Sequence, residues 1–292
     1  EQIRGLRRLV RHRDNLIRSN ARGLQLMQKC LIEMNMQLHN VINDISGDTG
    51  LQIIRAIVSG ERDPKILSGY RDSRCKNSEE IIEKSLQGHY KEEVLFSLKQ
   101  ILATYDHYLQ QVQQCDAEIS EKMLKFENKN DSGKSIKKKR EAKKNRFHFD
   151  AQNMLFNVLG VNLLDIPGMN AKSALTFISE VGTDVSKFRN AKNFTSWLGL
   201  SPNNKISGGK VLRKKTTNTS NRLKETLRMA SMAIEKTKTA LGGFCRKIKS
   251  KHGPKVAYTA TARKIAIIIY NMISKQEEYN HEYAQQCEQQ YN

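Results

Sequence analysis

Apolar residues recur at alternating spacings of three and four along the first 45 residues. The series runs through Ile3, Leu6, Val10, Arg13, Ile17, Asn20, Leu24, Met27, Leu31, Met34, Leu38, Val41 and Ile45. This spacing is the a and d pattern of a coiled coil, and it predicts one helix roughly 65 Å long. Only Arg13 and Asn20 interrupt the apolar seam. A buried asparagine there either fixes helix register or lines a solvent-filled gap, and both interpretations stay open.

A second seam with the same spacing follows after an insert. It runs through Leu98, Ile101, Tyr105, Tyr108, Val112, Cys115, Ile119 and Phe126. Gly47, Asp48 and Gly50 are expected to end the first helix, and residues 51–88 resemble short helices. Residues 1–127 are therefore predicted to form an antiparallel coiled-coil hairpin, with a small helical insert at about 47–88. A parallel dimer through the same seam is the alternative, and one assembly could contain both.

Residues 128–146 form a polar linker that carries a dense basic run. Its central cations are Lys137, Lys138, Lys139 and Arg140. Like charges at this density repel one another and resist folding without a partner. The segment is either a solvated linker or a phosphate-binding arm, and we favour the arm because the chain as a whole is basic.

The remaining sequence predicts a compact helical domain at 147–274 and a polar tail at 275–292. Helices are expected at 151–159, 170–181, 190–198, 219–240 and 255–274. Trp197, the only tryptophan, lies in an apolar helical context and is predicted to be in the core. The whole chain is thus predicted to be mainly α-helical.

The net charge of the chain indicates what class of partner it binds. The 292 residues include 50 Lys and Arg against 30 Asp and Glu, a net charge of +20. Such a surplus favours a polyanion. A membrane partner is not expected, since no apolar stretch is long enough to span a bilayer. The five cysteines are scattered without a CxxC pair, which argues against a zinc site and fits a reducing cytoplasm. The chain begins at Glu1 inside a predicted helix, so we expect a fragment of a longer protein.

The first motif of interest is the stretch from Ile166 to Leu175, which resembles a helix-hairpin-helix element. Pro167 and Gly168 form a tight turn before a helix that carries Lys172. Such a turn aims backbone N–H groups at a phosphate, and Lys172 adds charge. The alternative is a turn with a purely structural role.

The second motif is Ser207-Gly208-Gly209-Lys210. An exposed serine on a glycine loop can attack a phosphodiester if its hydroxyl is activated and the developing charge is neutralised. The surrounding cations are Lys205, Lys210, Arg213, Lys214 and Lys215. Arg222, Lys224 and Arg228 on the following helix are expected to extend them into a DNA-binding stripe. No histidine or carboxylate lies nearby in sequence, which argues against a self-sufficient hydrolase.

These motifs together resemble the C-terminal transposase domain of the insertion sequence 110 family. The similarity runs through Ile166-Pro167-Gly168, Phe194, Trp197-Leu198-Gly199-Leu200, Lys205 to Lys210, Asn221-Arg222, Ala240-Leu241-Gly242, Lys255, Ala262-Arg263-Lys264 and Glu277-Glu278-Tyr279. Upstream, Leu6 to Arg13, Ala56 to Pro64, Tyr105-Asp106 and Cys115 to Ile119 resemble the family's central coiled coil.

The resemblance implies a bacterial, cytoplasmic, nucleoid-associated recombinase that cleaves and joins DNA under the guidance of a bridge RNA. It implies a dimer that assembles into a tetramer, and a serine that forms a phosphoserine link to DNA. By position that serine is Ser207, with Ser201 as the nearest competitor. The family's RuvC-like domain, with four acidic metal ligands, has no counterpart in this sequence and is expected upstream of Glu1.

Two further expectations follow from the resemblance. No cofactor is expected in this chain, and Mg²⁺ is expected through the RuvC-like domain. Asp165, Glu180 and Asp184 are interpreted as structural residues rather than metal ligands. The alternative function is a coiled-coil and helix-hairpin-helix module that binds nucleic acid without chemistry.

Overall fold

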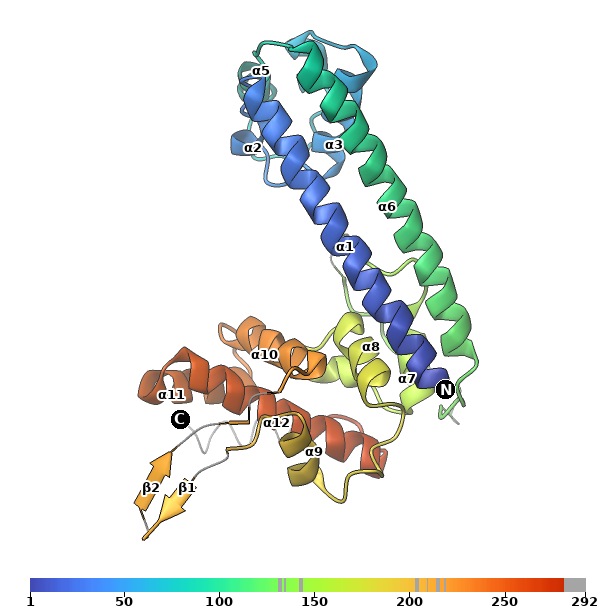
Figure 1. The fold of residues 1–292 in the computed structure, drawn as a ribbon, viewed down its shortest axis with the longest axis vertical. Helices are drawn as coiled ribbons and strands as arrows, with labels where there is room; N and C mark the ends of the chain where they lie inside the picture. The colour runs from blue at the N-terminus through green and yellow to red at the C-terminus, as the bar shows by residue number, and fades with distance from the viewer. Residues whose placement is uncertain are drawn as a thin grey trace. The chain divides into compact units, whose positions relative to one another are not determined.

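The computed structural model describes residues 1–130, 133, 135–141, 144–202, 205–208, 210–213, 216–217 and 219–280. At residues 205, 206 and 210–213 it describes the backbone alone. The protein is mainly helical, as the sequence predicted (Figure 1). No helix among the described residues is both long and apolar enough to cross a membrane.

The chain forms two compact units. One comprises His12–Cys115, and the other comprises Glu1–Arg11 with the described part of the chain from Asp116 onward. Helices α1 (Gln2–Glu33) and α6 (Glu92–Leu124) each contribute residues to both units. The domain limits expected from the sequence stay predictions.

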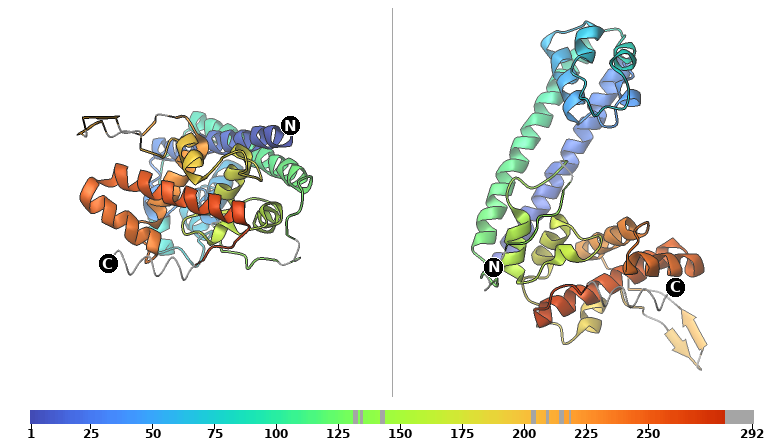
Figure 2. Two further views of the ribbon diagram at one scale, coloured as in Figure 1. Left: turned by 90° about the horizontal axis from the view of Figure 1, so that it is seen from below. Right: turned by 180° about the vertical axis from the view of Figure 1, so that it is seen from behind.

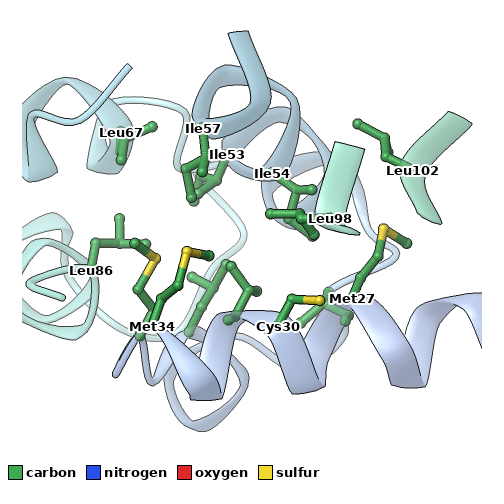
Figure 3. Close-up of a cluster of buried hydrophobic side chains, with 14 of the residues drawn as sticks. Met27, Cys30, Met34, Ile53, Ile54, Ile57, Leu67, Leu86, Leu98 and Leu102 are labelled. Atoms are coloured by element: carbon green, nitrogen blue, oxygen red, sulfur yellow. The ribbon is translucent and has the colours of Figure 1, made fainter. Parts of the chain in front are cut away.

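The His12–Cys115 unit is a helical hairpin capped by short helices. Its parts of α1 and α6 lie side by side in Figures 1 and 2. The cap contains α2 (Leu38–Val41), α3 (Asp48–Ser59), α4 (Pro64–Ser68) and α5 (Glu79–Ser85). Figure 3 shows side chains of α1, α3, α4 and α6 directed toward one another in this core. Burial of this apolar cluster is what holds the cap onto the hairpin.

Helix α1 ends earlier than its apolar period predicted. The prediction of one helix to residue 45 is wrong, because α1 ends at Glu33. Asn35 adopts a left-handed φ of 60°. The Met36 N–H donates to Leu31 O and the Asn35 N–H to Ile32 O, each at 2.8 Å, which is the Schellman pattern of a helix end. The apolar period continues beyond it because Leu38, Ile42 and Ile45 are buried in the cap.

The two polar interruptions of the first seam are both buried. Arg13 is 2% exposed and Asn20 is 8% exposed. The Asn20 Oδ1 has no hydrogen-bond partner within the described residues. Asn20 is thus a buried polar position of the seam, and both interpretations of it stay open. The parallel-dimer alternative stays a prediction.

The second unit places α12 (Pro254–Lys275) against three other helices. These are α9 (Ala191–Trp197), α10 (Arg222–Ile234) and α11 (Ala240–His252), shown from two further sides in Figure 2. Helix α8 (Ala171–Glu180) packs against α10 and against α7 (Ala151–Leu159). A 3₁₀ turn, η1 (Leu163–Asp165), lies between α7 and α8. Nearly every residue of α8 is buried, so this helix forms the centre of the unit's core.

The helix expected at 219–240 is shorter than predicted, and a second helix follows it. Helix α10 ends at Ile234 and α11 begins at Ala240. The Thr239 Oγ1 caps α11 by accepting the Gly242 N–H, and a Cβ at Gly242 would lie 2.5 Å from Thr237 O. The chain turns tightly here because glycine permits this close backbone approach. The sequence prediction missed α11.

Candidate nucleic-acid interface

The positive charge of the protein is concentrated in one stretch of its sequence. Between Val185 and Lys275 there are 21 Lys and Arg residues, and the only acidic residues are Glu225 and Glu235. This stretch therefore carries nearly all of the net charge of +20. A field of one sign over α9 to α12 attracts a polyanion and raises its rate of association.

The stretch contains a two-stranded hairpin where the sequence suggested a loop. Strand β1 (Lys205–Ser207) pairs antiparallel with β2 (Lys210–Arg213), and Ser207 faces Lys210 in the register. That register leaves two residues between the strands, and a connection of this length favours backbone of positive φ. Gly208 has a φ of 54°, and a Cβ added there would meet nothing within 4 Å. Ser207 is exposed. The serine thus lies beside an open turn that a DNA backbone can approach closely.

The base of the hairpin is fixed to the helical core. Pro202 and Thr216 form an isolated bridge between the two arms. The Thr219 hydroxyl donates to Leu198 O at 3.1 Å. Gly199 has a φ of 69°, and a Cβ there would lie 2.9 Å from Thr217 O. These contacts hold the two ends of the hairpin together where they leave the core.

Lys224 belongs to this base rather than to a DNA-binding stripe. It is 8% exposed, and its Nζ donates to Thr217 O at 3.4 Å. Arg228 is half-buried and bonds Glu225 on the same helix at 3.1 Å. Arg222 is half-buried at the start of α10. The expected continuous stripe is therefore wrong at Lys224, because the chain segment just before α10 covers that side chain.

The two candidate serines differ in their surroundings. Ser201 is half-buried, and its hydroxyl shares a hydrogen bond of 2.9 Å with the buried Thr195 hydroxyl. Ser207 is exposed beside Gly208. A nucleophile has to reach its phosphorus atom, so this geometry favours Ser207 over Ser201.

The Gly168 turn is packed as well as tight. Gly168 has a φ of 83°, and a Cβ there would lie 2.7 Å from Ala230 O on α10. The following helix α8 is capped by Asn170, whose Oδ1 accepts the Ser173 N–H at 2.9 Å. Lys172 is exposed. Glycine is thus required here by packing on α10, and the helix-hairpin-helix role of this turn stays a prediction.

Comparison with known families identifies the stretch that contains these features. Residues 161–242 match the family described as Transposase IS116/IS110/IS902 family. This segment is similar to a transposase domain and is called the transposase domain below. It contains the Gly168 turn, the hairpin with Ser207 and the start of α11, and the match supports a role in DNA transposition or recombination. No curated protein matches the chain.

The basic arm just upstream of the transposase domain is partly docked on α7. The Lys139 N–H donates to Gln152 Oε1 at 2.9 Å, and the Gln152 side chain returns a bond to Lys139 O at 2.8 Å. Lys138 pairs with Asp150 at 2.8 Å, and Lys139 pairs with Asp165 at 3.2 Å. Burial opposes ionisation of Asp150, yet its bonds with Lys138 and Asn153 keep its pKa below the usual value. Lys137 and Arg140 are exposed.

Some predicted contact residues lie outside what the structure describes. Gly209, Lys214 and Lys215 are not among the described residues, and only the backbone is described at Lys205, Lys210 and Arg213. Their expected contacts with nucleic acid stay predictions.

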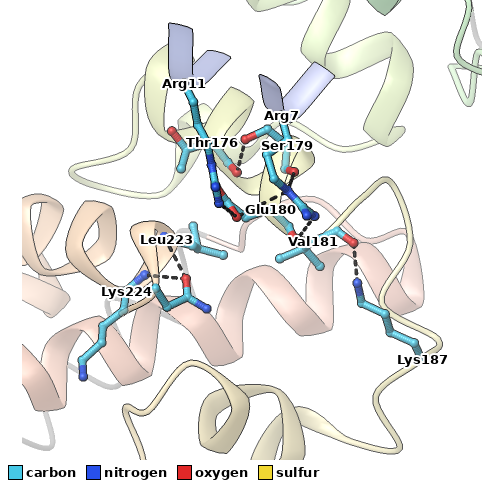
Figure 4. Close-up of polar contacts among 10 residues, drawn as sticks. Arg7, Arg11, Thr176, Ser179, Glu180, Val181, Lys187, Leu223 and Lys224 are labelled. Carbon is cyan, nitrogen blue, oxygen red and sulfur yellow. Dashed lines mark hydrogen bonds and ion pairs between the residues drawn. The ribbon is translucent and has the colours of Figure 1, made fainter. Parts of the chain in front are cut away.

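The carboxylates near the transposase domain serve local structure. Glu180 accepts bonds from Arg11 at 2.9 and 3.0 Å, and Arg7 binds the carbonyl oxygens at the end of α8 (Figure 4). Asp184 accepts bonds from the hydroxyl and N–H of Ser186, which lower its pKa. Asp165 pairs with Lys139. Among the described residues no three His, Cys, Asp or Glu side chains are placed to hold a metal ion, so they do not fit a Mg²⁺ site.

Trp197 is a second residue of the transposase domain that the sequence prediction placed wrongly. It is 42% exposed, whereas Phe194, Leu198 and Leu200 on either side of it are buried. Those neighbours face the core, and Trp197 lies on the outer side of α9. An exposed tryptophan in a basic stretch is a candidate binding residue rather than a core residue.

Proposed function

We propose that this chain cleaves and joins DNA strands in transposition, with Ser207 as the nucleophile and a bridge-type RNA as guide. The observation that carries the proposal is an exposed serine at the turn of a hairpin inside the basic stretch of a transposase domain. Family resemblance supports the RNA and the assembly of dimers into a tetramer. These partners are part of the proposal.

The chemistry needs one bond to form as another breaks. The Ser207 Oγ–phosphorus bond forms, the phosphorus–oxygen bond to the leaving strand breaks, and the serine proton passes to water. The leaving oxygen takes up a proton and becomes a hydroxyl. Attack of a strand hydroxyl on the phosphoserine reverses these steps. Because the phosphodiester energy is conserved in the covalent link, strands can be rejoined without ATP.

The basic stretch supports this reaction by neutralising charge. A pentacoordinate phosphate develops negative charge on its oxygens, and preorganised cations stabilise that charge best where water is scarce. The fixed base of the hairpin supports the proposal because it limits how far the serine can move relative to the domain core. Mg²⁺, which the resemblance assigns to a RuvC-like domain, has no fitting ligands among the described residues, and no step here is assigned to it.

The experiment tests for the covalent adduct in the full-length transposase with RNA, Mg²⁺ and cognate DNA. A DNA–protein adduct is expected on a denaturing gel, and Ser207→Ala should abolish it. Ser201→Ala is the matched control, since it removes the same atom from a half-buried position outside the turn and should retain the adduct. An adduct that persists in Ser207→Ala, or is lost only in Ser201→Ala, would show that the nucleophile is misassigned.

The basic arm offers a separate test of DNA or RNA binding. Neutralising Lys137 and Arg140 should weaken binding and flatten its dependence on salt, by about 0.9 in logarithmic slope for each duplex phosphate that is no longer neutralised. Lys138 and Lys139 are the matched pair, because their ion pairs with Asp150 and Asp165 already engage them. We expect a smaller change from their neutralisation. An unchanged slope in both pairs would identify the arm as a linker alone.

A further inference from the structure

The outer face of α9 combines one aromatic ring with polar and cationic side chains. Trp197 is 42% exposed there, and Lys192, Asn193 and Ser196 on the same short helix are also exposed. Arg189, just before the helix, is exposed as well. Trp197 thus presents part of a large aromatic surface to a ligand, beside polar and cationic side chains.

The ring is held in place from behind. Phe194 is fully buried, and its ring lies 6.3 Å from that of Trp197 at an angle of 18°. The Phe188 ring lies 5.3 Å away, and the Tyr270 hydroxyl of α12 donates to Phe188 O at 2.9 Å. Asn190 caps α9 by accepting the Asn193 N–H at 2.9 Å. A ring supported in this way loses little conformational entropy on binding a ligand.

The charge beside the ring is mainly positive, with Asp184 as the acidic group that acts on Lys187. The Lys187 Nζ lies 5.9 Å from the centre of the Trp197 ring and donates to Val181 O at 2.6 Å (Figure 4). Burial and the positive charge of Arg7 lower the pKa of Lys187. No acidic residue occurs between Val185 and Lys224. This environment suits an anionic ligand with an aromatic face and is poorly suited to a basic one.

We propose that the exposed face of Trp197 stacks on an unpaired base of a nucleic-acid strand. Arg189 and Lys192 would bind the neighbouring phosphates. Stacking on a supported aromatic ring within a basic surface is how proteins bind single strands without reading their sequence. A strand that is being exchanged has unpaired bases, and Trp197 gives the transposase domain a place to hold one. The proposal requires that the chain binds nucleic acid, but it does not depend on Ser207 chemistry.

The single tryptophan makes a direct test possible in the 292-residue chain. Titration with a short single-stranded oligothymidine should quench the tryptophan fluorescence. An abasic oligonucleotide of equal length, which supplies the phosphates alone, should bind without this quenching. Ser207→Ala should quench like the unaltered protein, so failure of the nucleophile assignment is distinguishable from failure of the stacking site.

Substitutions of Trp197 then test whether the residue that reports binding by fluorescence also contributes to the affinity for a single strand. Trp197→Leu should weaken binding of the single strand by roughly 5- to 100-fold, which is the range for removal of one stacked base, and Trp197→Tyr should restore part of it. Met229→Leu, at another exposed apolar position, is the matched control and should change nothing. Circular dichroism checks that each variant is folded.

Three results would overturn the stacking site. One is equal quenching by the abasic strand, and another is unchanged single-strand affinity in Trp197→Leu. The third is an emission maximum that shifts with protein concentration in the absence of nucleic acid, which would show that a second copy covers Trp197.

Discussion

Two stretches of this protein have the same kind of apolar core but differ in net charge, since one is neutral and the other strongly positive. Residues His12–Cys115 contain 13 Lys and Arg against 13 Asp and Glu, whereas Val185–Lys275 contain 21 against 2. Both bury leucine and isoleucine fully, as at Ile57 in the first and Leu227 in the second. Folding therefore does not require the charge imbalance. The difference indicates that the first stretch is a scaffold and the second faces a polyanion.

Helix capping shows the same contrast. In the basic stretch, α9, α10 and α11 are capped by the uncharged side chains of Asn190, Asn221 and Thr239. Elsewhere, α4 and α7 are capped by the carboxylates of Asp63 and Asp150, whereas α8 is capped by the uncharged side chain of Asn170. Either type satisfies the N–H groups at the start of a helix. An uncharged cap does so without adding negative charge, and so it preserves the field that attracts a polyanion.

The largest effect is expected from a cavity in the scaffold. Ile57→Ala removes a fully buried side chain from the cap of the helical hairpin and should destabilise that unit by about 2–5 kcal/mol. Urea denaturation followed by circular dichroism measures the destabilisation. Affinity for duplex DNA, measured by anisotropy where the variant is still folded, should not change. If Ile57→Ala also lowered the affinity for DNA, the distinction between a scaffold and a DNA-binding surface would be wrong.

A smaller loss of stability is expected from substitutions in the hairpin, and it should differ between the base of the hairpin and its turn. Gly199 and Gly208 both have positive φ, but only Gly199 is packed against neighbouring atoms. Left-handed backbone costs a residue with a Cβ roughly 1–2 kcal/mol. Gly208→Ala should therefore cost that amount within the hairpin, and Gly199→Ala should cost more because Thr217 and Thr219 have to move. Equal denaturation midpoints for the two variants would contradict the fixed base.

Apolar periodicity predicted most of the helices correctly. It failed where packing against segments distant in sequence determines where a helix ends. It placed α7 at its observed limits and found the hairpin of α1 and α6. It extended α1 too far, because apolar residues that fill the cap happen to continue the seam. The strand pair was missed since each strand is only three or four residues long. Two glycines between short runs that contain Ile206 and Val211 are a hairpin signal that could have found it.

The sequence predicted which residue types belong to the candidate site better than it predicted which of their side chains are exposed. The hairpin motif and its cations are visible in the sequence, and the match at 161–242 supports their domain. Lys224 was misplaced because no local pattern shows that Thr217 lies over it. Trp197 was misplaced because its apolar neighbours face inward while it faces outward. Both errors concern which side of a helix is covered, which the local apolar pattern does not show.

The charge contrast predicts unequal roles for exposed lysines in the two stretches. Lys251→Gln with Lys255→Gln, at the junction of α11 and α12, should flatten the salt dependence of DNA binding. The expected change is about 0.9 in logarithmic slope for each duplex phosphate that is no longer neutralised. Lys76→Gln with Lys84→Gln removes the same charge from exposed positions of the scaffold and should leave the slope unchanged. Equal slopes for the two double variants would mean that net charge alone controls binding.

The smallest effect concerns one of the two acidic residues retained in the basic stretch. The Glu235 carboxylate accepts bonds of 2.5 Å from Lys249 of α11 and from Tyr258 of α12. These bonds lower its pKa below the ordinary value of 4.5. A carboxylate of lowered pKa stabilises the fold above its unfolded-state pKa, and the stabilisation is lost as pH falls through the folded-state pKa. Glu235 therefore joins α10, α11 and α12 at neutral pH.

Glu235→Gln should lower the denaturation midpoint at neutral pH, and its difference from the unaltered protein should shrink as pH falls below 4.5. Glu225→Gln is the matched control, because it removes the other acidic charge of the stretch but only a bond to Arg228 on the same helix. Its difference should be smaller at neutral pH. If both variants have the same midpoint at every pH, then Glu235 acts only through its charge and the joining of α10, α11 and α12 by this carboxylate is wrong.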